Sequence, residues 1–247
     1  AVTAVTPTSV AITLDQWKEA PFAMSDQAIS QVQQGIIPMQ MSEAVKSLAN
    51  TIDGYLWGLI DSASGVYGYA GTAGTTPFAS AVTTYLDARA IANNQLMPMD
   101  DRFVILDADA EANALALTAF LDASASGSKE TVLKGDIGYK LGAQWLMSQN
   151  VSTFTSTNSP SSWLVNDASV AVGDTTFTVD GGSGAPVEGD IFSVAGSTQT
   201  YLVTSATATV ITMTPAVTYA YADNAALTFK ADRVNNLLLH RDLIGFA

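Results

Sequence analysis

The sequence predicts an α+β fold, and three features of the 247-residue chain support this prediction. A long segment that begins at Pro38 repeats its apolar side chains at helical spacing. The run RFVIL, 102–106, has the continuous apolar character of a buried central strand. From 165 to 229, short β-type runs separated by Gly, Asp and Pro turns are typical of a small sandwich or barrel. The chain therefore combines a mixed helical and stranded part with a small all-β module.

The N-terminal segment 1–24 is expected to be an extended arm, because apolar and polar residues alternate in it after Pro7. Ser25 is a suitable N-cap for a helix over 26–34. A lone subunit could cover the apolar strip of this arm only poorly, so we expect the strip to contact a neighbouring subunit. Its side chains are Val10, Ile12, Leu14 and Trp17.

The helix predicted from Pro38 carries proline in its first turn, where the missing N–H costs nothing. At ~1.5 Å per residue it would be a rod of roughly 36 Å, which is long for a globular helix. Polar residues such as Glu43 and Lys46 lie on its other faces. The residues that follow the i, i+3, i+4, i+7 pattern are Met41, Ala44, Val45, Leu48, Ile52, Tyr55, Leu56 and Leu59.

The middle of the chain predicts further helices and strands. The Gly-rich segment 64–78 lacks the Lys-Ser/Thr pair of a phosphate-binding loop, so a flexible connector is favoured over a phosphate site at Gly68, Gly71 and Gly74. Helices are expected over 78–94 and over 107–121, the second of them largely buried. The segment 139–151 is predicted to be one strand that leads to an edge.

The all-β module is predicted to be an insertion, because core-type residues return after it and its two ends should therefore lie close together. Its turns are Gly173-Asp174, Gly181-Gly182, Gly189-Asp190 and Pro215, and its predicted interior is Val170, Val172, Phe177, Val179, Ile191, Phe192, Val203, Ile211 and Phe229. The chain thus divides into an arm, a peripheral region with the long helix, a two-piece core domain and an inserted β-sandwich or barrel: 1–24, 25–80, 81–164 with 230–247, and 165–229.

The composition excludes several classes of function. Ten Lys and Arg against 23 Asp and Glu give a net charge of −13, which argues against tight binding of DNA or RNA. The absence of Cys removes disulfides, thiolate metal sites and cysteine nucleophiles. No run reaches the ~20 apolar residues of a membrane helix. Charged residues make up 13% of the chain against a usual ~25%, which suits subunits that hide surface against neighbours.

The only histidine, His240, is expected to be a packing residue. Leucines precede it and apolar residues follow it, and in a strand the adjacent Arg241 and Asp242 would point to opposite faces, so no catalytic triad is predicted. Carboxylate-pair hydrolysis remains open, because acids far apart in sequence can meet in space.

The alternating polar residues after 106 resemble the start of a calcium-binding loop, but the rest of the segment does not match one. Its sixth position is Ala112 where glycine is needed, and its twelfth is Thr118 where Glu is needed. The acids are instead expected to favour a helix dipole. The residues concerned are Asp107, Asp109, Glu111 and Asn113. We predict no enzyme activity and no catalytic, cofactor-binding or metal site.

Several segments, taken in order, resemble the major capsid proteins of tailed bacteriophages, in particular the Salmonella podovirus coat-protein type with the Hong Kong 97 capsid fold. AITLDQWKEAPFAMSD and IIPMQMSEAVKSLANTIDGYLW resemble its extended loop and spine helix. MPMDDRFVILDADAEANAL is similar to its helix-to-strand passage, and LLLHRDLIGFA to a strand near its end. KGDIGYKLGAQWLMSQNV matches another of its segments through Gly135, Ile137, Gly138, Gly142, Ser148 and Asn150.

The resemblance implies an extended loop, a spine helix, a mixed sheet with flanking helices and an extra β domain. It implies a shell subunit that forms hexamers and pentamers, encloses double-stranded DNA without binding it specifically, and meets scaffolding, portal or decoration proteins. No cofactor or membrane is implied; the location would be the virion, after assembly in the bacterial cytoplasm. The expected subunit contacts are Val10, Ile12, Leu14, Trp17, Glu43 and Lys46.

Two alternatives stay open. The shell of a cellular nanocompartment has the same fold and would enclose a cargo enzyme instead of DNA. The β module could also bind glycans, which would make the chain an adhesion or binding protein.

Overall fold

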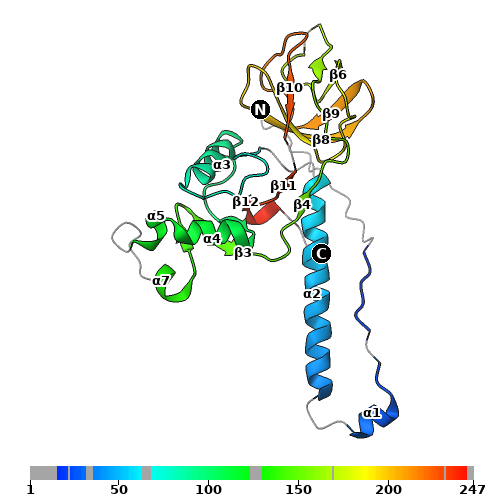
Figure 1. The fold of residues 1–247 in the computed structure, drawn as a ribbon, viewed down its shortest axis with the longest axis vertical. Coiled ribbons are helices and arrows are strands. Elements are labelled where there is room, and N and C mark those ends of the chain that lie inside the picture. The colour runs from blue at the N-terminus through cyan, green and yellow to red at the C-terminus, as the bar shows by residue number, and fades with distance from the viewer. Residues whose placement is uncertain are drawn as a thin grey trace, which may run out of the picture. The chain divides into compact units, whose positions relative to one another are not determined.

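The computed structural model describes residues 16–21, 23–31, 36–62, 68–122, 130–168, 170–230 and 232–243 (Figure 1). The chain divides into two compact units, 1–53 and 54–247. Among the helices that these ranges contain, none has the length and apolar character needed to cross a bilayer.

The first unit contains α1 (Asp26–Gln31) and most of α2 (Ile36–Ser62). α1 begins directly after Ser25, as predicted. α2 begins two residues before Pro38, which therefore still lies in the first turn, where backbone N–H groups have no partner within the helix. Of the predicted arm, 16–21 and 23–25 form neither helix nor strand, and the alternating part lies outside the described residues.

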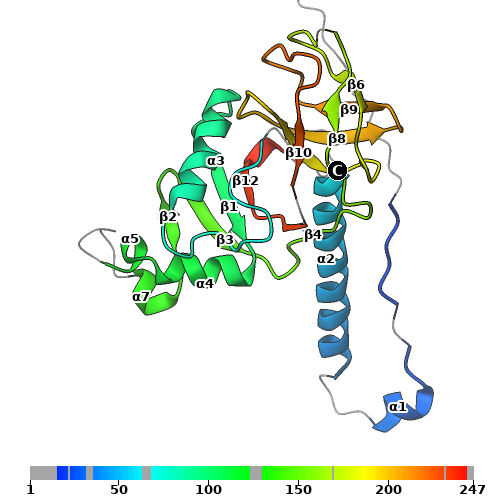
Figure 2. The same ribbon diagram turned by 45° about the horizontal axis from the view of Figure 1, so that its top comes forward.

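A four-stranded sheet forms the core of the second unit (Figure 2). Its order is β12 (Leu237–His240), β1 (Arg102–Leu106), β3 (Ala143–Met147) and β2 (Gly138–Lys140). β1 runs parallel to β3 and antiparallel to β12, so the prediction of a central strand at RFVIL is confirmed.

The prediction of one strand over 139–151 was wrong, because the chain reverses within it. Leu141 and Gly142 both have positive φ, 55° and 82°, as a two-residue hairpin turn requires. β2 and β3 pair across this turn, and β2 rather than β3 is the edge strand. A leucine rarely adopts positive φ, so the turn has no local sequence signal.

The helices of this unit are α3 (Thr83–Asn94), α4 (Ala108–Ala116), α5 (Thr118–Leu121) and α7 (Glu130–Lys134). The helix predicted over 107–121 is two helices, because the extended backbone of Leu117 interrupts it. The helix predicted from 78 begins only at Thr83; Phe78 has a φ of 66°, which no helix tolerates.

Trp145 on β3 is the centre of the packing between this sheet and its helices. Its ring lies 5.6 Å from Phe78, 5.0 Å from Tyr85 and 5.1 Å from Phe120, measured between ring centroids. Its indole N–H donates to the carbonyl of Lys140. Burial raises the pKa of the Tyr85 phenol. The three aromatic partners come from separate segments, so this one side chain ties the sheet to α3 and α5.

Six strands between β3 and β12 in the chain form a second sheet, in the order β10 (Leu227–Phe229), β7 (Ile191–Val194), β8 (Thr200–Ala206), β9 (Val210–Thr214), β6 (Thr176–Asp180) and β5 (Leu164–Val165). The two outer strands meet through a bridge between Leu164 and Ala226. The N–H of Val165 also donates to the carbonyl of Ala225 at 2.9 Å. The sheet therefore closes into a small barrel, and the chain segments that enter and leave it, near 164 and 226, lie side by side.

Seven of the nine residues predicted to fill the barrel are buried, and Phe229 is partly buried against them. The prediction that Val172 lies in the interior was wrong, because this residue lies in a turn and is 66% exposed. Buried apolar residues that the sequence pattern did not identify are Trp163, Val165, Val194, Tyr201, Leu202, Met213, Val217, Tyr221 and Leu227.

A two-stranded ribbon, β4 (Thr153–Phe154) with β11 (Arg233–Val234), lies where the chain enters and leaves the barrel. A 3-10 turn, η1 (Arg241–Leu243), follows β12.

Candidate assembly surfaces

In the first unit, the three predicted contact residues that the structure describes lie on exposed surface. Trp17 is 92% exposed. Glu43 and Lys46 form an exposed ion pair with a distance of 2.8 Å. Exposed pairs contribute only ~0–1 kcal/mol, so either partner can exchange to another chain at little cost. Val10, Ile12 and Leu14 lie outside the described residues.

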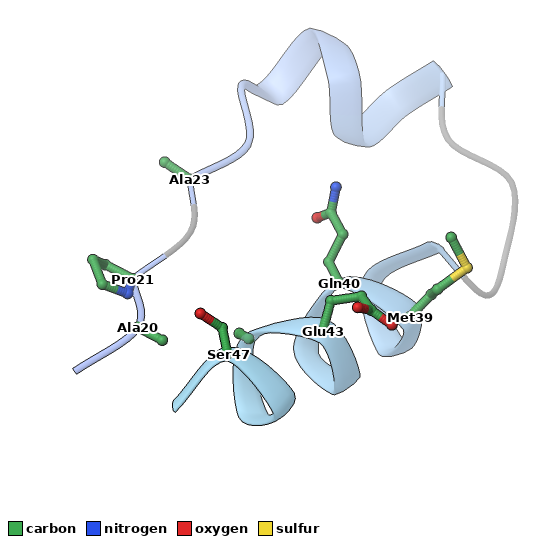
Figure 3. Close-up of a pocket in the computed structure, with 8 residues that line it drawn as sticks. Ala20, Pro21, Ala23, Met39, Gln40, Glu43 and Ser47 are labelled. Atoms are coloured by element: carbon green, nitrogen blue, oxygen red, sulfur yellow. The ribbon is translucent and has the colours of Figure 1, made fainter. Parts of the chain in front are cut away.

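A shallow groove of about 410 Å³ separates the segment that follows Trp17 from α2 (Figure 3). Ala20, Pro21 and Ala23 line one side of it. The α2 side is lined by Met39, Gln40, Glu43, Ala44 and Ser47. The segment therefore approaches α2 on the face that carries these residues.

In the second unit, the surroundings of His240 are those of a structural residue. Its side chain is 16% exposed, and Nδ1 accepts a hydrogen bond from the backbone N–H of Asp242 at 3.2 Å. Arg241 and Asp242 lie in η1 and not in a strand as expected, because the chain turns directly after β12. Arg241 forms an ion pair with Asp101 at 2.9 Å. Asp242 is 73% exposed, so the buried acid of a triad is missing here.

The acids after β1 form a helix N-terminus, as predicted. The side chain of Asp107 accepts from the backbone N–H of Asp109, and Asp109 and Glu111 lie in the first turn of α4. In the described part of the chain, no three side chains of metal-ligating type come together.

The Gly-rich connector packs closely on α3 at one point. A Cβ on Gly68 would lie 2.2 Å from Cγ2 of Ile91, so only glycine fits. This packing accounts for Gly68 without a ligand.

Sequence reasoning missed the polar cluster that joins the barrel to the core, here called the Arg233 cluster (Ser152, Phe154, Gly189, Arg233 and Asn235). Arg233 is 6% exposed. Its guanidinium donates to the carbonyl of Gly189 at 2.8 Å and to Oδ1 of Asn235 at 3.0 Å, and lies 4.2 Å over the Phe154 ring. Asn235 in turn donates to the Ser152 hydroxyl at 2.8 Å. The one feature of the sequence that could have pointed to Arg233 is that basic residues are scarce, with ten Lys and Arg in the chain.

Further hydrogen bonds support the same junction. The backbone N–H of Tyr69 donates to the Thr200 hydroxyl at 2.9 Å, and that of Lys230 to the carbonyl of Ile191 at 2.8 Å. Burial raises the pKa of the Tyr69 phenol, and the positive charge of Arg233 opposes that shift. The barrel is thus held to the core by directional polar contacts, and these fix an orientation.

A model of the phage capsid protein family matches residues 7–196, which include α2, the core strands β1 to β3 and the first strands of the barrel. The chain belongs to the phage capsid protein family. The resemblance noted in the sequence is thereby confirmed at the level of the family, and the chain is a structural protein of a bacteriophage coat.

Nine chains of solved structures also match this capsid protein. One, described as Mycobacterium phage Che8, is 16% identical; the alignment covers 89% of this chain and 68% of that one, with a TM-score of 0.45. No curated protein matches.

Proposed function

We propose that this capsid protein is the repeating subunit of an icosahedral shell with the Hong Kong 97 fold, which forms hexamers and pentamers around double-stranded DNA. The family match over 7–196 carries the proposal, because it spans the long helix and three of the four strands of the core sheet. The presence of a long helix, a four-stranded sheet and a barrel in one chain supports it.

The charge of the chain supports enclosure of DNA without specific binding. A net charge of −13 makes the wall repel packaged phosphates and leaves the duplex free to move. Shell formation also needs no catalytic group, and we propose that the chain is not an enzyme. Assembly in the bacterial cytoplasm and contacts with scaffolding, portal or decoration proteins belong to the same proposal.

The arm residues are proposed to act between subunits. Trp17, 92% exposed, is the described member of the strip that also includes Val10, Ile12 and Leu14. Glu43 and Lys46 are proposed as the polar part of the same contact. Burial of each large apolar side chain would contribute ~1.5–3 kcal/mol to assembly.

The barrel is proposed to be an insertion, 165–229, in a core of 81–164 with 230–247, after an arm of 1–24 and a peripheral region of 25–80. Its separate buried core and the closeness of its two ends support this division. In this role it would project from the outer face and adjust contacts between subunits.

Particle imaging tests the proposal most directly. The full chain would be expressed in bacteria, with and without its scaffolding partner, and the sedimenting fraction examined by negative-stain microscopy. Closed particles of uniform diameter are expected, and only small soluble oligomers under both conditions would contradict the proposal. Particles isolated from infected cells should contain nuclease-protected DNA; a captured enzyme in its place would identify a nanocompartment.

A further inference from the structure

Helix α2 carries a heptad stripe, here called the α2 seam. Its six members are separated by four, three, four, three and four positions, which is the a/d spacing of a coiled coil, and the apolar Ala44, Ala49 and Leu56 lie beside them. A stripe with this spacing suits another helix as the partner. The α2 seam consists of Met41, Val45, Leu48, Ile52, Tyr55 and Leu59.

The chain leaves much of this stripe uncovered. Met41 is 55% exposed, Val45 66%, Tyr55 38% and Leu59 44%. Trp57, which helical spacing puts on the opposite face, is 4% exposed. The segment after Trp17 approaches a different face, the one with Glu43 and Ser47 (Figure 3). None of the residues that line the groove between this segment and α2 belongs to the α2 seam, in which only Leu48 and Ile52 are partly buried.

The positions that flank the α2 seam indicate which helix would cover it. None of them is charged: they are Ser42, Ala44, Ala49, Thr51, Leu56 and Gly58. Coiled coils choose foreign partners through charges at these positions. In a chain with a net charge of −13, an uncharged flank is also where two identical surfaces can meet without repulsion. A Cβ on Gly58 would meet nothing within 4 Å in its own chain, so room for a close neighbour exists there.

From these observations we propose that α2 of a second copy packs along the α2 seam, so that neighbouring subunits are joined by a helix pair. The axes would lie ~8–10 Å apart and cross at about +20°. The inference rests on the proposed shell function, because the shell supplies the second copy.

Cysteine cross-linking tests the helix pair, since the chain has no Cys to compete. Leu48→Cys and Ile52→Cys would be introduced singly into the full chain. Oxidation should give covalent dimers of each single variant if the helices are parallel, or of the two variants mixed together if they are antiparallel, because positions 48 and 52 straddle the centre of the seam. Asn50→Cys, on the opposite face, is the matched control and should cross-link at least tenfold less.

A charge substitution supplies the second measurement. Val45→Glu should leave the circular dichroism and thermal midpoint of the free subunit nearly unchanged, because the side chain is exposed, and should suppress cross-linking through Ile52→Cys at least tenfold. Asn50→Glu, the control on the opposite face, should leave both the free subunit and the cross-linking unchanged. Particles that form normally without either type of cross-link, or cross-links that join Ile52→Cys to a different protein, would overturn the helix pair while the proposed shell function stands. Failure of the unmodified chain to form particles would instead contradict the shell function.

Discussion

The barrel and helix α2 both carry many apolar side chains, but the barrel buries them and α2 leaves many of them exposed. The barrel encloses a cluster of fourteen buried residues and needs no second molecule to do so. Along the 27 residues of α2, Trp57 is the only described side chain that is buried. Apolar surface that a chain does not cover for itself must be covered by a neighbour or remain in water. Substitutions in the barrel should therefore change the stability of the single chain, and substitutions in the first unit should change assembly.

The largest effect on folding is expected from Phe192→Ala. Its ring is fully buried and lies 6.0 Å from Phe177, 5.4 Å from Tyr201 and 5.3 Å from Phe229. Truncation should lower the free energy of unfolding by ~3–5 kcal/mol. Val172→Ala, at an exposed barrel position, is the control and should change it by less than ~0.5 kcal/mol. Equal effects in urea titrations would show that the barrel has no core of its own.

A smaller loss is expected from Arg233→Met, which keeps the length of the side chain but removes its donors. The carbonyl of Gly189 would lose a buried hydrogen bond, at a cost of ~1–3 kcal/mol. Because the barrel core is untouched, the loss should appear as faster amide exchange and proteolysis near β4 and β11. Unchanged exchange there would contradict a joining role for the Arg233 cluster. Arg241→Met, at an exposed ion pair, is the control.

Tyr201→Phe should have a still smaller effect that depends on pH. Burial, and next the hydrogen bond with Tyr221 (2.7 Å between the hydroxyl oxygens), raise the pKa of the Tyr201 phenol above its ordinary value of 10.0. The folded chain holds this proton more tightly than the unfolded chain, so the contribution is complete below pH 10.0 and is lost as pH rises above it.

Removing the hydroxyl should cost ~0.5–1.5 kcal/mol at neutral pH and should make the decline of stability above pH 10 shallower. Urea titrations of both proteins at neutral and strongly alkaline pH measure the difference. Parallel pH profiles would contradict a titrating role for Tyr201. Tyr219→Phe, at a 60% exposed phenol, is the control.

The smallest effect on folding is expected from Trp17→Ala, because the side chain is 92% exposed. The free energy of unfolding should change by less than ~0.5 kcal/mol. Assembly should nevertheless weaken by ~1.5–3 kcal/mol per subunit contact if the ring is buried against a neighbour. Sedimentation velocity over a concentration series measures this, and an unchanged critical concentration would remove Trp17 from the interface.

Features that depend on residues close together in the sequence could be predicted, and features that depend on residues far apart in the sequence could not. Periodicity within one segment was sufficient to predict α2 and the central strand β1. The interior of the barrel was identified correctly where alternation was regular, as at Phe177 and Val179, and wrongly at Val172, where a turn begins. Leu117 and Leu141 carry no local signal of the interruption and the turn that they make.

The sequence alone thus determined the long helix, the central strand, the run of short strands after them and the capsid family, because these depend on side-chain patterns along short stretches and on motifs in a fixed order. Only the tertiary structure decided which strands are neighbours. β1 lies between β3 and β12, which follow it at very different distances along the chain, and the barrel closes through residues 164 and 226. The Arg233 cluster likewise joins segments that no local pattern connects. Such pairings depend on which distant surfaces fit together, and for α2 the proposed fit is to a second molecule.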